Sequence, residues 1–295
     1  MRVNPNPLPD VLAALAQTQQ QINTALQELA SGRSVNVPSD SPAGAAELIQ
    51  NSGQTAEADQ FLRSAGSVQG EIQNADSTLN SVVTSLQRAI SLGVEGANGT
   101  LNSSDRAALA TEVQGIQAQL LSLANLTYQG NYVFAGTATQ TTPYVLTPGS
   151  PSGVTYQGNS GVNSVTLGNH FTLETNVPGS QLFSAPGKDM FQSIQDLITG
   201  LQSGTGIPAA VNEVSSAYGY INAKRVFYGN AVNQLNAQQT FLSSETTQLA
   251  QQQNKIGGAD MASVISNLTN AETARQATLA AVGQTARTNL FDFIK

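Results

Sequence analysis

The 295-residue chain has no cysteine and only one histidine, His170. Without cysteine there is neither a disulfide nor a thiolate nucleophile. A lone histidine does not make a Ser-His-Asp relay, and a metal site would need more histidines or clustered carboxylates, whereas the acidic residues here are dispersed. No phosphate-binding loop pattern is present either. The sequence therefore predicts no enzymatic activity, no metal and no cofactor.

Charge and long apolar runs are also scarce. Only 11% of residues are charged and 5% are aromatic, against a usual charged fraction of about 25%. The net charge is −7 and the basic residues are scattered singly, which argues against a nucleic-acid partner. No apolar run approaches the roughly 20 residues of a spanning helix, so no membrane partner is expected. The first residues lack an apolar core, which predicts no cleavable secretory signal.

What the sequence does contain is a pair of apolar stripes, one at each end. Residues spaced three, four and seven apart share one face of a helix, and such a face requires a partner. The two stripes could pack on each other within one molecule or on other copies of the chain. We predict an assembly interface at Leu8, Leu15, Ile22, Leu29, Met261, Ile265, Leu268, Leu279, Val282, Leu290, Phe291 and Phe293.

Helix signals dominate both flanks, and β-type runs separated by turn residues fill the middle. Gly32 and the pair Gly257-Gly258 are expected to end helices, and Ser41 and Asp260 to begin them. The predicted helices run from about 8 to 31, from 42 to about 98, from about 103 to 123 and around 190–201, followed by one ending near 256 and a terminal one. Short strands are predicted at 132–134, 144–146, 154–156, 165–167 and 171–173.

The two longest predicted helices carry apolar heptads. In the second of them one heptad position is apolar throughout, from Val214 to Ile256, while the companion position is mixed and includes Arg225 and Gln239. A mixed row suits packing inside a bundle. We expected Arg225 to reach solvent along its stem rather than to pair with a buried partner. The predicted fold is mainly α with a small β insert, a long antiparallel helical bundle built from both halves of the chain.

Three segments resemble bacterial flagellins and hook-associated proteins. The segment ASGRSVNVPSDSPAG (30–44) resembles the one that follows their first helix. The passage GNYVFAGT (130–137) is similar to the entry into the variable domain of the junction proteins of this family, and the close NLFDFI (289–294) is similar to their terminus. The resemblance therefore covers the whole chain and is strongest in its outer segments.

The resemblance implies a structural subunit at the hook–filament junction of the flagellum. Its partners would be copies of itself, hook-associated protein 1, flagellin and an export chaperone on the C-terminal helix. The subunit would leave the cell unfolded through the flagellar type III apparatus. The expected division is a terminal coiled-coil region (1–38 and 258–295), a long-helix rod (39–140 and 187–257) and a small β-rich outer domain (141–186).

Two other functions remain open at this point. A short flagellin, the filament subunit itself, would carry the same terminal segments. A secreted helical protein whose β insert binds a ligand or receptor would share the composition. The resemblance favours packing of the terminal stripes between molecules, whereas the pattern alone does not choose between the two.

Overall fold

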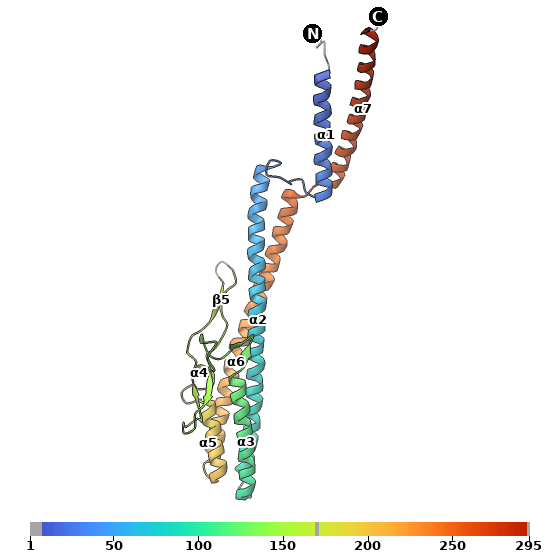
Figure 1. Cartoon of the computed structure of the whole chain (residues 1–295). Coiled ribbons are helices and arrows are strands. Elements are labelled where there is room, and N and C mark those ends of the chain that lie inside the picture. Colours follow the sequence, from blue (N-terminus) through green and yellow to red (C-terminus); the bar gives the residue numbers. More distant parts are fainter. Residues whose placement is uncertain (1–7, 169–170, 294–295) are drawn as a thin grey trace. The chain divides into compact units, whose positions relative to one another are not determined.

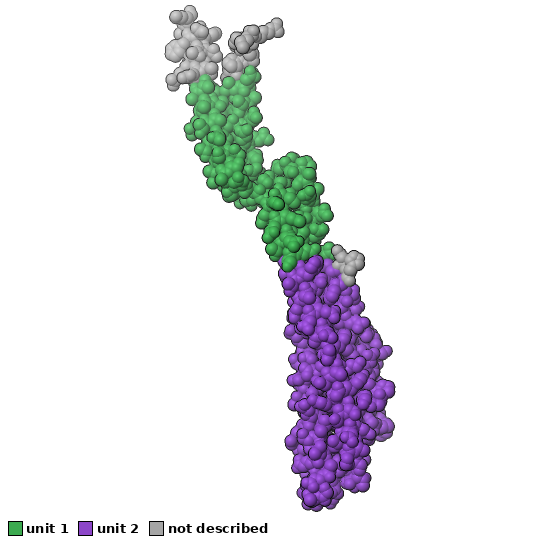
Figure 2. All heavy atoms as spheres, turned by 180° about the vertical axis from the view of Figure 1, so that it is seen from behind, with its two compact units in different colours: residues 1–57, 244–295 green, residues 58–243 purple. Residues whose placement is uncertain are grey.

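The computed structural model describes residues 8–168 and 171–293, and side chains over residues 9–168 and 171–283. The predicted mainly α fold with a small β insert is confirmed. The chain divides into two compact units, residues 1–57 with 244–295 (unit 1) and residues 58–243 (unit 2), coloured separately in Figure 2. In chain order the elements are α1 (Leu8–Ser31), α2 (Pro42–Gly96), α3 (Ser103–Ala124), β1 (Thr127–Tyr128), β2 (Asn131–Tyr132), β3 (Tyr144–Leu146), β4 (Val154–Tyr156), β5 (Ser164–Thr166), β6 (Thr172–Glu174), α4 (Gly179–Leu182), α5 (Met190–Ser203), α6 (Ile207–Gly257) and α7 (Met261–Phe293) (Figure 1).

In unit 1 the two terminal helices, α1 and α7, lie side by side and antiparallel (Figure 1). Their contact is made by small and medium apolar side chains: Ile22, Ala25, Val264 and Ala271 are all buried. Alanine at the contact lets two helices approach closely, and the apolar area removed from water stabilises the pair. The apolar stripes at the two ends of the chain therefore meet within one molecule along part of their length.

The two links that lead out of this helix pair are tied to each other. Gly32 closes α1 with φ +68°, the left-handed conformation that glycine adopts without strain. The N–H of Ser34 donates to the carbonyl of Gly257 (2.8 Å), and the N–H of Ala259 donates to the carbonyl of Gly32 (3.0 Å). The link after α1 and the link before α7 are thus paired through a short antiparallel bridge between Arg33 and Gly258.

Capping side chains set the starts of the next helices. In the link after α1, the N–H groups of Val37 and Asn36 donate to the Asp40 carboxylate and hold its pKa below the ordinary value. The Ser41 hydroxyl accepts from the N–H of Gly44, with Pro42 as the first helical residue, as the sequence predicts. Asp260 likewise accepts from the first N–H groups of α7.

In unit 2, α2 and α6 run antiparallel, and α3 and α5 pack together beside them (Figure 1). Polar pairs between α2 and α6 show the direction, because Gln87 bonds Tyr218 while Gln69 bonds Asn236. The predicted apolar heptads are the core of this unit. From α2 they bury Ala65, Ile72, Leu79 and Leu86, and from α6 they bury Val214, Ile221, Tyr228 and Leu235.

The β insert consists of three two-stranded antiparallel sheets, β1-β2, β3-β4 and β5-β6. Its centre is Tyr144, whose ring lies 5.0 Å from the rings of Tyr156 and Phe191, centroid to centroid. The Tyr144 hydroxyl donates to the Gly179 carbonyl at 2.8 Å, while the side chain of Asn125 bonds both the N–H and the carbonyl of Tyr144. The insert is thereby anchored to the end of α3.

One predicted strand boundary in this region is wrong. The strand predicted at 132–134 ends at Tyr132, because Val133 and Phe134 turn into the core. There the rings of Phe134 and Phe183 pack edge to face with their centroids 5.1 Å apart. The second helix ends at Gly96, close to the predicted end near Asn98. The one-turn helix α4 was not predicted, since four residues are too few for a periodic signal.

Candidate assembly surface

The predicted interface residues fall into three groups. Ile22 is buried, and Leu15, Leu29, Leu268 and Val282 are half-buried. Met261, Ile265 and Leu279 are exposed, the latter two by about half, at 53% and 52%. The side chains of Leu8, Leu290, Phe291 and Phe293 lie outside the described residues.

The exposed members lie on one face of α7, two near its start and one further along. Met261, Ile265 and Leu279 are four and fourteen residues apart, close to whole turns at about 3.6 residues per turn, so they share one face. Val264 and Ala271, which are buried against α1, belong to the neighbouring face. We call Met261, Ile265 and Leu279 the α7 stripe. Full burial of an exposed leucine or isoleucine side chain stabilises a structure by roughly 1.5–3 kcal/mol, so burial of these residues in a contact would be favourable.

The first helix has exposed apolar residues of its own. Leu12 and Leu26 are fourteen residues apart on one face of α1, and both are more exposed than the residues that contact α7. The predicted set did not include them, although they flank the same stripe. The sequence pattern places both on that flank, three residues from Leu15 and Leu29, but does not show that they stay exposed when α1 pairs with α7.

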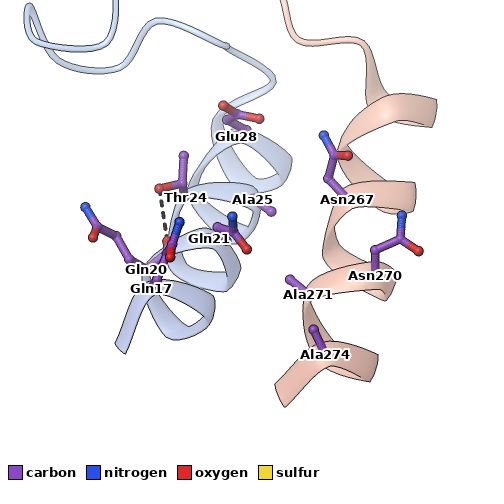
Figure 3. Close-up of a pocket in the computed structure, with 10 residues that line it drawn as sticks. All are labelled: Gln17, Gln20, Gln21, Thr24, Ala25, Glu28, Asn267, Asn270, Ala271 and Ala274. Carbon is purple, nitrogen blue, oxygen red and sulfur yellow. Dashed lines mark hydrogen bonds between the residues drawn. The ribbon is translucent and has the colours of Figure 1, made fainter. Parts of the chain in front are cut away.

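Between α1 and α7 runs a groove of about 700 Å³ with a mixed polar and apolar lining (Figure 3). Amide side chains from both helices border it, and the buried Ala25 and Ala271 lie between them. Amides donate and accept at once, so the groove offers hydrogen bonds beside the apolar surface of its alanines. Its lining residues are Gln17, Gln20, Gln21, Thr24, Ala25, Glu28, Asn267, Asn270, Ala271 and Ala274.

An arginine joins the two helices near this groove. The Arg275 Nη1 lies 3.5 Å from the Gln19 Oε1, and the Arg275 Nε is buried without a hydrogen-bond partner among the described residues. A buried donor without a partner costs free energy. The pairing of α1 with α7 is thus apolar at its centre and incompletely satisfied at this polar position.

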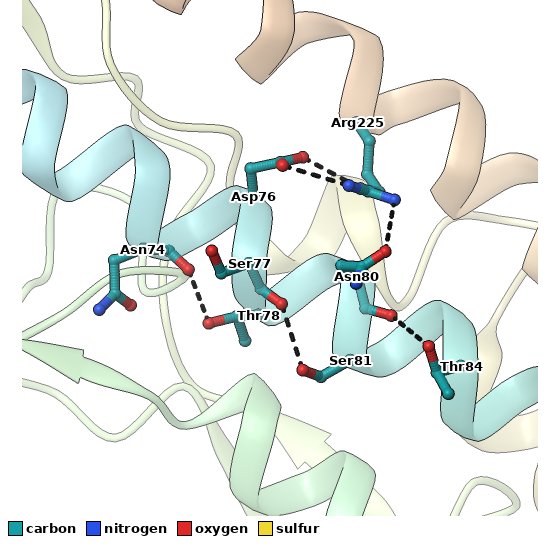
Figure 4. A network of polar contacts seen from close by, with 8 residues as sticks. All are labelled: Asn74, Asp76, Ser77, Thr78, Asn80, Ser81, Thr84 and Arg225. Carbon is teal, nitrogen blue, oxygen red and sulfur yellow. Dashed lines mark hydrogen bonds and ion pairs between the residues drawn. The ribbon is translucent and has the colours of Figure 1, made fainter.

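The expectation for Arg225 is wrong. Its guanidinium spans from α6 to α2, where Nε lies 3.0 Å from the Asp76 Oδ1 and Nη2 lies 3.1 Å from the Asp76 Oδ2 (Figure 4). Nη1 donates to the Asn80 Oδ1 at 3.0 Å. The planar fork of arginine matches a carboxylate in this two-point geometry, which a solvent-reaching side chain would not provide.

Other candidate sites are not supported by the described part of the chain. His170 lies outside the described residues. Over residues 8–168 and 171–293 no group of three or more histidines and carboxylates could hold a metal ion. None of the described helices is long and apolar enough to cross a bilayer. The exposed apolar residues of α1 and α7 and the groove between these helices are the features considered below.

Comparison with known proteins defines the class. Residues 10–139 match the bacterial flagellin N-terminal helical region. The solved structure of hook-associated protein 3 from Legionella pneumophila shares the fold with a TM-score of 0.64 at 16% identity, over 70% of this chain and 98% of that one. FlgL from Bacillus cereus shares it with a TM-score of 0.58 at 20% identity, over 71% and 100%. The resemblance to the flagellin family is therefore confirmed.

Over most of its length the chain is similar to flagellar hook-associated protein 3. The chain is 26% identical to this protein of Escherichia coli over 290 residues, which are 91% of the chain and 92% of the relative. It is 33% identical to the Salmonella typhimurium protein over 162 residues, or 54% of the chain and 49% of the relative. Flagellin A of Vibrio cholerae matches at 30% identity over 39% of the chain.

Proposed function

We propose that the chain is a structural subunit of the hook–filament junction, with no enzymatic activity, which polymerises through its terminal helices. The observation that carries the proposal is the α7 stripe, an apolar face left exposed by a helix whose neighbouring face is already buried on α1. It is supported by the resemblance to hook-associated protein 3, which extends over 91% of the chain.

In this proposal hook-associated protein 1 lies on one side of the subunit and flagellin on the other. The protein is exported through the flagellar type III apparatus and acts outside the cell, with a cytoplasmic chaperone on its C-terminal helix before export. The division into an assembly region (1–38, 258–295), a rod (39–140, 187–257) and an outer domain (141–186) belongs to the same proposal. Leu290, Phe291 and Phe293 would extend the assembly interface to the end of α7.

The interface residues divide by role. Ile22 packs on α7 within the chain and holds the helix pair together. Met261, Ile265 and Leu279, joined by Leu12 and Leu26, are free to contact neighbouring subunits. Burial of the α7 stripe between copies would then supply the apolar contribution to assembly, and the amide-lined groove would supply hydrogen bonds.

The test replaces two stripe residues by glutamine, an efficient helix former that the chain already uses on exposed faces. Ile265→Gln with Leu279→Gln is produced in a strain that lacks the native copy, next to the matched control Val226→Gln with Phe241→Gln. The control residues are also exposed, at 60% and 61%, but lie on α6 in unit 2. Each variant is assayed for export into the medium, for incorporation and for motility.

We expect both variants to keep their helicity and to be exported, with unfolding free energies within about 0.5 kcal/mol of the native chain. Only the α7 variant should fail to enter the junction, and only the cells that produce it should lose their filaments. Normal incorporation of that variant would contradict the assignment of the stripe, and so would an equal loss in the α6 control. Growth of long filaments from the purified chain on a seed would instead identify a flagellin.

A further inference from the structure

The turn that joins α2 to α3 contains the single Asn-Gly dipeptide of the sequence, Asn98-Gly99. Both residues are exposed and lie between the end of α2 at Gly96 and the start of α3 at Ser103. A backbone nitrogen that follows asparagine can attack the side-chain amide, and glycine permits the approach best because it has no Cβ and few backbone restrictions. The dipeptide alone is a weak signal, so the geometry of the turn decides.

Thr100 supplies two donors to the side-chain carbonyl of Asn98. Its N–H lies 3.2 Å from the Asn98 Oδ1, and its hydroxyl Oγ1 lies 3.0 Å from the same oxygen. Two donors on one carbonyl oxygen withdraw electrons from the carbon and stabilise the negative charge that develops when a nucleophile adds to it. Thr100 therefore activates Asn98 for attack at Cγ.

The other reacting atoms are free. Among the described residues no hydrogen bond engages the Gly99 nitrogen or the Asn98 Nδ2. A Cβ built on Gly99 would meet no atom within 4 Å, so the peptide has room to rotate towards the side chain. The nucleophile (the Gly99 nitrogen), the activated carbonyl (Asn98 Cγ–Oδ1) and the leaving group (Asn98 Nδ2) thus lie together in one exposed turn.

We propose that Asn98 is a site of spontaneous deamidation through a cyclic imide. Hydroxide removes the proton of the Gly99 N–H, and the nitrogen forms a bond to the Asn98 Cγ while Oδ1 takes the negative charge between the two Thr100 donors. The carbonyl re-forms, the Cγ–Nδ2 bond breaks, and the amine takes a proton from water and leaves as ammonia. Water then opens the imide at either carbonyl, giving aspartate or isoaspartate, and both products add one negative charge to the turn.

Other asparagines lack this combination. The Asn125 side chain bonds both the N–H and the carbonyl of Tyr144, and Leu126 follows it. The Asn102 Oδ1 caps α3 by accepting from the N–H of Asp105, and Ser103 follows it. Asparagines inside helices are held with their backbone N–H groups in the helical ladder. Deamidation should therefore begin at Asn98.

The product would differ from the original turn in backbone as well as charge. In isoaspartate the main chain runs through Cβ and Cγ and is one carbon longer, and the former backbone carbonyl of Asn98, which accepts from the N–H of Leu101, becomes a carboxylate. The side-chain nitrogen leaves as ammonia, so the loss of asparagine is irreversible and the modified fraction increases with the age of the molecule. This site goes beyond the proposed assembly function and does not depend on it.

The test uses the full-length chain, incubated at constant temperature in mildly alkaline buffer and sampled over time. Cleavage after arginine releases the peptide 89–106, which contains only Asn98 and Asn102, and fragmentation mass spectrometry locates the deamidated residue and distinguishes isoaspartate. Three variants are run in parallel: Gly99→Ala, Thr100→Val and Thr111→Val. The last removes an exposed threonine hydroxyl from α3 and serves as the matched control.

We expect Asn98 to deamidate faster than any other asparagine, and Gly99→Ala to slow it most. Thr100→Val keeps the N–H donor and loses the hydroxyl, and should slow the reaction by about twofold to tenfold, less than the loss of a donor in a dry enzyme site. Thr111→Val should leave the rate unchanged. The proposal is overturned if another asparagine reacts first or if Gly99→Ala reacts at the native rate. An unchanged rate in Thr100→Val would refute the role of its hydroxyl.

Discussion

The ion pair between Arg225 and Asp76 is expected to stabilise unit 2 more than the ion pair between Arg88 and Glu112, although the second pair is shorter. Arg225 joins α6 to α2 with Nε 3.0 Å from the Asp76 Oδ1. Arg88 joins α2 to α3 with Nη2 2.6 Å from the Glu112 Oε1. The side chains of Arg225 and Asp76 are 24% and 37% exposed, whereas those of Arg88 and Glu112 are 58% and 46% exposed.

Exposure decides the magnitude because water screens the attraction and competes for both charges. Exposed pairs contribute about 0.2–1 kcal/mol. Removal of one partner from a fully buried pair costs about 3–5 kcal/mol. The Arg225–Asp76 pair lies between these limits, and its two-point contact favours a coupling energy of about 1–2 kcal/mol. For Arg88 and Glu112 we expect about 0.5 kcal/mol or less.

Two double-mutant cycles measure these energies, Arg225→Ala with Asp76→Ala and Arg88→Ala with Glu112→Ala. Unfolding in urea is followed by tyrosine fluorescence, because the chain has no tryptophan and its seven tyrosines all lie within residues 58–243. The signal therefore reports on unit 2 alone. Asn80 also bonds Arg225, so the first cycle isolates only the Asp76 contribution. A coupling energy for Arg225 and Asp76 no larger than that for Arg88 and Glu112 would refute the reasoning.

Two further predictions concern the insert and its tyrosines. Gly136→Ala should cost more than Gly130→Ala, because both glycines have positive φ (+72° and +84°) but an added Cβ at Gly136 would collide with Asn159, whereas at Gly130 it meets nothing within 4 Å. The left-handed backbone conformation costs both alanine variants roughly 1–2 kcal/mol, so only the collision distinguishes them. Equal urea midpoints for the two variants would therefore disprove the collision. Burial raises the pKa values of Tyr144 and Tyr228 above the ordinary value of 10.0. Above that pH the unfolded chain releases protons that the folded chain retains, so unit 2 should lose stability as pH rises, and Tyr144→Phe with Tyr228→Phe should weaken that dependence in urea melts.

The helices were predictable because their signals are local and repeated. Leu8–Ser31 is bounded as predicted, since Gly32 and the proline-containing link after it mark the end. The apolar heptads of α2 and α6 predicted the core of unit 2 in the same way. The insert was less predictable, because two- and three-residue strands carry almost no period. Whether Val133 and Phe134 continue a strand or turn inward depends on Phe183, nearly fifty residues further along the chain.

Arg225 shows why polar residues at core positions are hard to predict. The heptad places it on the face of α6 that packs on α2, but the outcome depends on which residue of the antiparallel helix lies opposite. Asp76 lies there because the helices pair in the register that also brings Gln69 to Asn236. That register is a property of the whole unit, so a single helix pattern does not contain it.

The same reasoning explains why the candidate surface was only partly predictable. A heptad stripe identifies all the apolar positions on a helix but not how they divide between two partners. On α7 the division follows rotation: Val264 and Ala271 face α1, whereas Met261, Ile265 and Leu279 lie on the adjoining face. If α7 packed only on α1, its apolar residues would need to occupy no more than the face that α1 buries. The apolar surface of α7 is wider than α1 covers, and this excess width, rather than the presence of a stripe, is the feature that favours a second partner.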